Sequence, residues 1–118
     1  MKQIIVRFDG HKVFPVQIES VVGRHKAVGT CAVVGVPDRE HAQGMLPLVV
    51  VELKGTLQEP VDRAAIRREI LDLCDRELEE RGKPVDLVFV EQMPHTAMSK
   101  NDVMLLQEQY REYDYRKR

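Results

Sequence analysis

Residues 27–36 read AVGTCAVVGV and residues 47–53 read PLVVVEL, and these two runs decide the fold. Both are short, apolar and rich in valine, which is typical of strands that are buried on both faces of a sheet. Pro37 and Asp38 end the first run, and the polar residues 39–46 between the runs predict a turn. The sequence therefore predicts one sheet that contains both runs.

The chain that follows changes from a strand pattern to a helical one. Ile66, Ile70 and Cys74 recur at a spacing of four residues, which predicts a helix over 60–81 with one apolar stripe. Residues 85–90, VDLVFV, return to the apolar and β-branched composition of a strand. We therefore expect a third sheet strand there, covered by the helix that precedes it.

The N-terminal part predicts a β-hairpin. Residues 3–8, QIIVRF, lead into Asp9-Gly10, a pair that tolerates positive φ and so favours a tight turn. The return strand is expected over 11–14. A proline then opens a predicted helix over 16–23, where its missing N–H group does no harm.

The C-terminal part predicts a loop, a short helix and a charged end. The loop covers residues 91–100, EQMPHTAMSK, and either Asn101 or Asp102 is the expected N-cap of the helix. Residues 112–118, EYDYRKR, are mostly charged, and we expect them to fray. The predicted fold class is α+β, with an N-terminal β-hairpin followed by a small three-stranded sheet covered by two to three helices.

Length and composition restrict the protein class. A chain of 118 residues predicts a single domain over 1–118. The formal net charge of -1, the absence of tryptophan and an aromatic content of 5% argue against a nucleic-acid partner. No apolar run is long enough for a membrane span and no signal peptide is recognised, so a cytoplasmic protein is expected.

The sequence carries few signs of chemistry. It has no phosphate-binding glycine loop, zinc-protease motif or serine-hydrolase motif, and it predicts no metal site. Cys31 and Cys74 are far apart and lack a metal-binding spacing, which favours buried, reduced thiols over a disulfide. The histidines are scattered in or beside predicted turns, as expected of surface residues: His11, His25, His41 and His95.

Lys100 is the residue with the clearest chemical potential. It ends the polar loop between the third strand and the last helix, and loops on a rigid scaffold are common sites of binding residues. A lysine presents a point charge on a long stem, which suits a phosphate or a carboxylate. On these residues alone, an ordinary surface lysine is the favoured interpretation.

Four segments in a fixed order resemble the C-terminal domain of the AMP-forming ligase superfamily, which contains acyl-coenzyme A synthetases, nonribosomal peptide adenylation domains and firefly luciferase. They are FDGHKVFPVQIESVV (8–22), HKAVGTCAVVGVPD (25–38), LPLVVVELKG (46–55) and FVEQMPHTAMSK (89–100). The last is similar to the family pattern F-V-x-x-L-P-x-T-x-x-G-K. Together the four segments span almost the whole chain.

The resemblance implies a role for two sites. The family's catalytic lysine matches Lys100, which would serve formation of an acyl-adenylate from ATP, Mg²⁺ and a carboxylic acid. Gly10, His11 and Lys12 match the loop that lines the pantetheine channel after the domain rotates for the second half-reaction. The acceptor would be coenzyme A, or else the pantetheine arm of a carrier protein. The family's hinge residue would lie near residues 2–3.

This chain departs from the family pattern at several positions. Ser99 replaces the glycine before the lysine, and a serine is less comfortable there if the backbone needs positive φ. Val103 stands where a basic residue is often found. Lys26 replaces the proline of the H-P pair, and Gln17 replaces the first glutamate of E-I-E.

The nucleotide-binding parts of the superfamily are not recognised in this sequence. The resemblance therefore implies an excised C-terminal domain whose N-terminal adenylation domain is absent, and we expect it to form no adenylate alone. The alternative is a free-standing α+β binding or regulatory module without catalytic activity. The acid substrate is not predicted, because the pocket that selects it belongs to the N-terminal domain.

Overall fold

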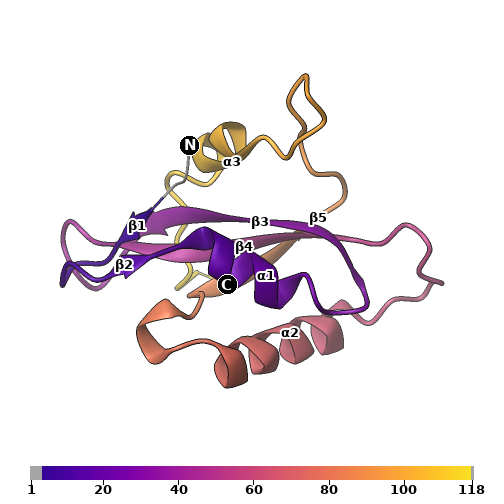
Figure 1. Ribbon diagram of the computed structural model, residues 1–118, viewed down its shortest axis with the longest axis horizontal. Coiled ribbons are helices and arrows are strands. Elements are labelled where there is room, and N and C mark those ends of the chain that lie inside the picture. The colour runs from indigo at the N-terminus through magenta and orange to yellow at the C-terminus, as the bar shows by residue number, and fades with distance from the viewer. Residues whose placement is uncertain (1–3, 118) are drawn as a thin grey trace.

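The computed structural model describes residues 4–117 and confirms the α+β fold class (Figure 1). A two-stranded hairpin sheet precedes a three-stranded sheet, and three α-helices pack around them. In chain order the elements are β1 (Ile5–Val6), β2 (Lys12–Val13), α1 (Pro15–Val22), β3 (Val28–Pro37), β4 (Met45–Leu53), α2 (Arg63–Glu77), a 3-10 turn η1 (Glu80–Gly82), β5 (Asp86–Val90) and α3 (Val103–Gln109).

The larger sheet has the order β3-β4-β5, in which β3 and β4 are antiparallel and β4 and β5 are parallel. Helix α2 makes the crossover that a parallel pair requires. The predicted strands 27–36, 47–53 and 85–90 match β3, β4 and β5, with ends that differ by at most two residues. Both faces of the sheet are covered, with α3 on one side and α2 on the other in Figure 1.

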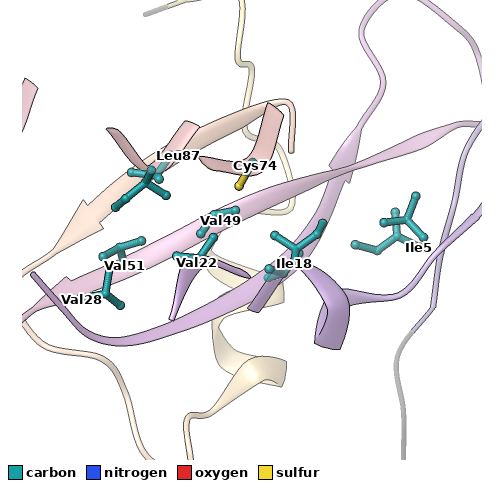
Figure 2. Packing of buried hydrophobic residues seen from close by; sticks show 11 residues of the cluster. Ile5, Ile18, Val22, Val28, Val49, Val51, Cys74 and Leu87 are labelled. Atoms are coloured by element: carbon teal, nitrogen blue, oxygen red, sulfur yellow. The ribbon is translucent and has the colours of Figure 1, made fainter. Parts of the chain in front are cut away.

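The alternation of side chains along β3 and β4 builds two separate cores. Val33 and Val49, a directly paired couple, face α1 and α2, where they pack with Ile18 and Ile70. Figure 2 shows Ile18 and Val49 in this cluster. Neighbouring positions point to the opposite face, where Val34, Leu48 and others surround the buried Leu106 of α3. A valine-rich strand with no polar alternation is what a sheet buried on both faces requires.

The outer edge of β3 is covered by side chains rather than by another strand. The Gln107 side chain of α3 accepts a hydrogen bond from the Gly35 N–H at 3.0 Å and donates one to the Gly35 carbonyl at 2.5 Å. Glu19 of α1 accepts from the Val33 N–H at 3.0 Å. Burial raises the pKa of the Glu19 carboxyl, since the charged form loses water there. These bonds satisfy groups that would otherwise invite edge-to-edge pairing.

The predicted bounds of the helix over 60–81 are wrong at both ends. It begins at Arg63, because the Asp62 side chain caps it by accepting a hydrogen bond from the Ala65 N–H at 3.0 Å. It ends at Glu77, because Leu78 adopts an extended backbone and packs against the core on the α1 side. The predicted helix 16–23 is confirmed as Pro15–Val22.

The expectation that residues 112–118 fray is wrong for the described part of that segment. The Tyr113 hydroxyl donates to Asp86 at 2.5 Å, and the Tyr115 hydroxyl accepts from the Arg39 N–H at 3.1 Å. Asp86 is the buried charged residue at the start of β5, and it also contacts the Arg67 guanidinium at 2.5 Å. Two tyrosines of this segment therefore attach it to the rest of the domain, although its charged composition suggested exposure.

Both cysteines are free, as predicted. Cys74 of α2 points into the core and is buried (Figure 2), and Cys31 of β3 is half-buried. Burial raises the pKa of each thiol to about 11, so neither is a ready nucleophile at neutral pH. Within residues 4–117, no helix has the length and apolar character needed to cross a membrane.

Candidate functional site

The hairpin between β1 and β2 presents the first candidate segment. The Arg7 N–H donates to the His11 carbonyl and the Gly10 N–H donates to the Arg7 carbonyl, both at 2.9 Å. The loop therefore has three residues, with Gly10 at φ 86°, and not the two-residue Asp9-Gly10 turn that the sequence predicted. A left-handed third residue is typical of three-residue hairpin loops, and glycine adopts it without strain.

A hydrogen bond and an ion pair hold this hairpin against the segment that follows α2. The His11 Nε2 atom lies 2.7 Å from a Glu79 carboxylate oxygen, and Asp9 lies 3.7 Å from the Arg81 guanidinium. The Asp9 pKa is lowered, mainly because its carboxylate accepts the His11 N–H. Lys12 is exposed on β2. The contacts with Glu79 and Arg81 thus hold the hairpin in place. Gly10 itself is open, since no atom beyond its chain neighbours lies within 4 Å of a Cβ built on it.

The loop before α3 presents Lys100 with the same backbone design. The Thr96 N–H donates to the Lys100 carbonyl at 2.7 Å, and the Ser99 N–H donates to the Thr96 carbonyl at 2.9 Å. Ser99 occupies the left-handed third position, with φ 63°. Lys100 therefore stands directly after the left-handed residue of its loop, as His11 does in the first hairpin.

The left-handed backbone of Ser99 explains the glycine of the family pattern at this position. An L-residue with a Cβ atom is strained by roughly 1–2 kcal/mol in this conformation. Glycine avoids that strain, but it loses more conformational entropy on folding, which offsets part of the gain. We expect Ser99→Gly to raise the free energy of unfolding of this chain by about 0.5–1 kcal/mol, measured by urea denaturation. Ala97→Gly, in the same loop, is the control and should not stabilise; equal effects of both substitutions would contradict the explanation.

The Lys100 side chain is exposed, and the structure gives it no hydrogen bond or ion pair within residues 4–117. Its neighbours in the loop are also open to solvent, including Met98, whose exposed fraction is 78%. A lysine held on a closed loop with an unengaged ammonium group can reach an anionic group on another surface. This arrangement can bind a phosphate or a carboxylate.

Residues distant in sequence hold the Lys100 loop on the sheet. Asn101, one of the two expected N-caps, instead donates its side-chain amide to Thr30 of β3, and Asp102 is the N-cap of α3, accepting from the Leu105 N–H at 3.0 Å. At the other end of the loop, the Met93 N–H donates to Glu52 of β4. Sequence reasoning missed these supports, because they join segments far apart in the chain and leave no local signal.

The two candidate segments do not form one site. In Figure 1 the hairpin lies at one end of the molecule, whereas the loop that carries Lys100 projects above the sheet on the α3 side, away from the hairpin. Within the described part of the chain, no group of three or more histidine, cysteine or acidic residues is placed to hold a metal ion. The expected hinge near residues 2–3 lies outside the described residues.

Comparison with known proteins identifies the family. The model of the AMP-binding enzyme C-terminal domain matches residues 17–100, which include Lys100 but not the first hairpin. Acetyl-coenzyme A synthetase of Burkholderia mallei (strain SAVP1) is 30% identical over 96 residues, which are 81% of this chain and 14% of that protein. The chain thus spans about one seventh of this curated relative.

Solved structures agree with this match. The anthranilate CoA ligase AuaEII, solved in complex with anthranoyl-AMP, superposes with a TM-score of 0.77 and 31% identity, over 91% of this chain and 20% of that one. A Mycobacterium tuberculosis fatty acyl CoA synthetase gives a TM-score of 0.72 and 27% identity, over 91% and 19%. The chain belongs to the AMP-binding enzyme C-terminal domain family, within the superfamily of acyl-CoA synthetases and adenylation enzymes.

Proposed function

We propose that this chain acts as the C-terminal domain of an AMP-forming acid–thiol ligase, together with an N-terminal adenylation domain that binds ATP, Mg²⁺ and the carboxylic acid. Lys100 would supply the positive charge for adenylate formation, and Gly10, His11 and Lys12 would line the path of the thiol. The observation that carries the proposal is the family match that ends on Lys100, a lysine presented on a closed, exposed loop.

The chemistry of the first step explains the need for this cation. A carboxylate attacks the α-phosphorus of ATP, the new C–O–P bond forms an acyl-adenylate, and pyrophosphate leaves. Two anions must approach each other, and negative charge builds on the phosphoryl oxygens in the transition state. An ammonium group placed there by a neighbouring domain stabilises that charge, and it does so most strongly once water is excluded.

The separation of the two candidate segments suits an enzyme that uses its domain twice. In the second step a thiol displaces AMP from the adenylate, and a thioester forms. Since the hairpin and the Lys100 loop lie apart on the surface of the molecule (Figure 1), one orientation of the domain can present Lys100 and another can present the hairpin. Rotation about a hinge is a common means of such an exchange. Coenzyme A is the acceptor we propose, with a carrier-protein arm as the alternative.

The hairpin offers a test of this division of labour in the complete ligase. Gly10→Leu adds a side chain where the backbone is open and left-handed, so it should narrow a channel along the hairpin. We expect thioester formation from supplied acyl-adenylate to slow about 10- to 100-fold, as for a misplacement of about 1 Å, while acid-dependent ATP–pyrophosphate exchange keeps its rate. Both half-reactions are followed by separate assays.

Gly55→Leu is the matched control, because Gly55 is exposed and also has no atom within 4 Å of its Cβ position. It should change neither half-reaction. If Gly10→Leu leaves the rate of thioester formation unchanged, the hairpin does not line the path of the thiol. Adenylate formation by the 118-residue chain alone would contradict the need for a second domain, and would favour a different enzyme class.

A further inference from the structure

We propose that Asn101 and Thr30 are positioning residues for adenylate formation, because their hydrogen bond fixes the Lys100 loop to the edge strand of the sheet. The inference rests on the proposed function of Lys100. It concerns residues that act through Lys100 and do not touch the substrate. The pair is separated by 71 positions in the sequence and meets only in the fold.

The contact has a defined geometry. The Asn101 Nδ2 atom lies 2.9 Å from the Thr30 Oγ1 atom and 3.2 Å from the Cys31 carbonyl oxygen. Since a carbonyl oxygen only accepts, the NH₂ group of Asn101 must face β3. One side chain therefore binds both a hydroxyl and a backbone oxygen of the same strand, and it is half-buried there.

The position of the contact ties it to Lys100 and not to the helix in general. Asn101 is the next residue in the chain, and it forms an isolated antiparallel bridge with His95 across the base of the loop. The bond from the Thr96 N–H to the Lys100 carbonyl closes the loop directly above that bridge. Fixing Asn101 to β3 therefore fixes the Cα atom from which the Lys100 stem extends.

Both ends of the loop are attached to the same place on the sheet. Thr30 of β3 is the direct partner of Glu52 of β4 in the antiparallel register. Glu52 accepts the hydrogen bond of the Met93 N–H at 2.5 Å, and the Met93 side chain is buried beneath α3. Thr30 therefore holds the end of the loop at Asn101, and Glu52 holds its beginning at Met93. The loop residues between Met93 and Asn101 form a short projection whose base is fixed at both ends.

This support matters because of the length of the lysine stem. The ammonium group sits at the end of a flexible four-carbon stem, so its average position depends on how firmly the backbone is held. A displacement of about 1 Å at a positioned group costs up to about 10²-fold in rate. The sheet supplies a rigid base for a group that must enter the cleft of a second domain.

The test compares variants of the complete ligase in separate half-reactions. Asn101→Leu and Thr30→Val remove the hydrogen bond at nearly constant size, and Thr30→Ser keeps the hydroxyl. We expect the first two to lower kcat of acid-dependent ATP–pyrophosphate exchange about 10- to 100-fold with KM for ATP unchanged. Thioester formation from supplied adenylate should keep its rate, and Thr30→Ser should restore exchange to within about twofold of the parent enzyme.

Gln107→Leu is the matched control, since Gln107 also binds the edge of β3, but at Gly35 and from the last turn of α3. It should lower stability without a selective effect on exchange. Lys100→Ala combined with Asn101→Leu should be no slower than Lys100→Ala alone, because a positioning residue has no effect once its group is gone. In the 118-residue chain, Asn101→Leu should also speed the amide exchange of the Thr96 N–H.

The outcomes separate this inference from the proposed function. If Lys100→Ala stops exchange but Asn101→Leu and Thr30→Val leave it unchanged, the positioning role is overturned and the proposed function stands. The positioning role is also overturned if these variants slow both half-reactions alike, or slow the Lys100→Ala enzyme further by the same factor. If Lys100→Ala leaves exchange unchanged, both the proposed function and the positioning role are overturned.

Discussion

Replacing Lys100 with alanine in the complete ligase is expected to slow adenylate formation about 10²- to 10³-fold, the usual loss when one preorganised charge donor is removed from a transition state. The structure gives the Lys100 side chain no partner within residues 4–117, so the substitution should not disturb the fold of this domain. Acid-dependent ATP–pyrophosphate exchange measures the loss. Thioester formation from supplied acyl-adenylate should be largely spared, because the proposed function assigns this charge to the first step only.

Two variants make this result specific. Lys54→Ala removes another exposed lysine, from the turn after β4, and should leave both half-reactions unchanged. Lys100→Arg keeps the charge but changes its shape and reach, so an intermediate exchange rate is expected. Equal losses in both half-reactions, or no loss in either, would contradict the assignment and favour a binding module without catalysis.

The largest effect on stability is expected at Asp86, the buried carboxylate that joins three parts of the chain. It accepts hydrogen bonds from its neighbour Leu87 at 2.8 Å, from Arg67 of α2 and from the Tyr113 hydroxyl near the C-terminus. Removing one partner of a buried pair costs about 3–5 kcal/mol. Since the Arg67 side chain keeps an exposed fraction of 26%, we expect Asp86→Ala to lower the free energy of unfolding by about 3 kcal/mol.

Urea denaturation of the 118-residue chain measures this loss. Asp72→Ala, on the exposed side of α2, is the control and should change stability by no more than about 0.5 kcal/mol. Asp86→Asn keeps an acceptor for the Leu87 N–H and should therefore be less harmful than Asp86→Ala. If Asp86→Ala stays within about 1 kcal/mol of the parent chain, the three contacts have little net value, as some buried ion pairs do.

The parts of the fold that the sequence predicted correctly are those where local pattern and burial agree. Strands β3 and β4 are valine-rich apolar runs, and a short run without polar alternation is typical of a strand covered on both faces. The ends of α2 were predicted wrongly, because the sequence pattern did not reveal which polar residue caps the helix or that Leu78 leaves it for the core. The C-terminal segment was predicted to fray, because its charge conceals the contacts of Tyr113 and Tyr115.

The candidate site divides in the same way. The sequence alone determined the strand runs and the turn glycine at position 10, because these are properties of neighbouring residues. The order of its motifs, through a family resemblance, singled out Lys100 as a candidate. Only the tertiary structure decided that Ser99 is left-handed and that Asn101 binds Thr30. The Asn101–Thr30 contact joins segments 71 positions apart in the chain, and its free energy depends on a geometry that no local pattern of residues records.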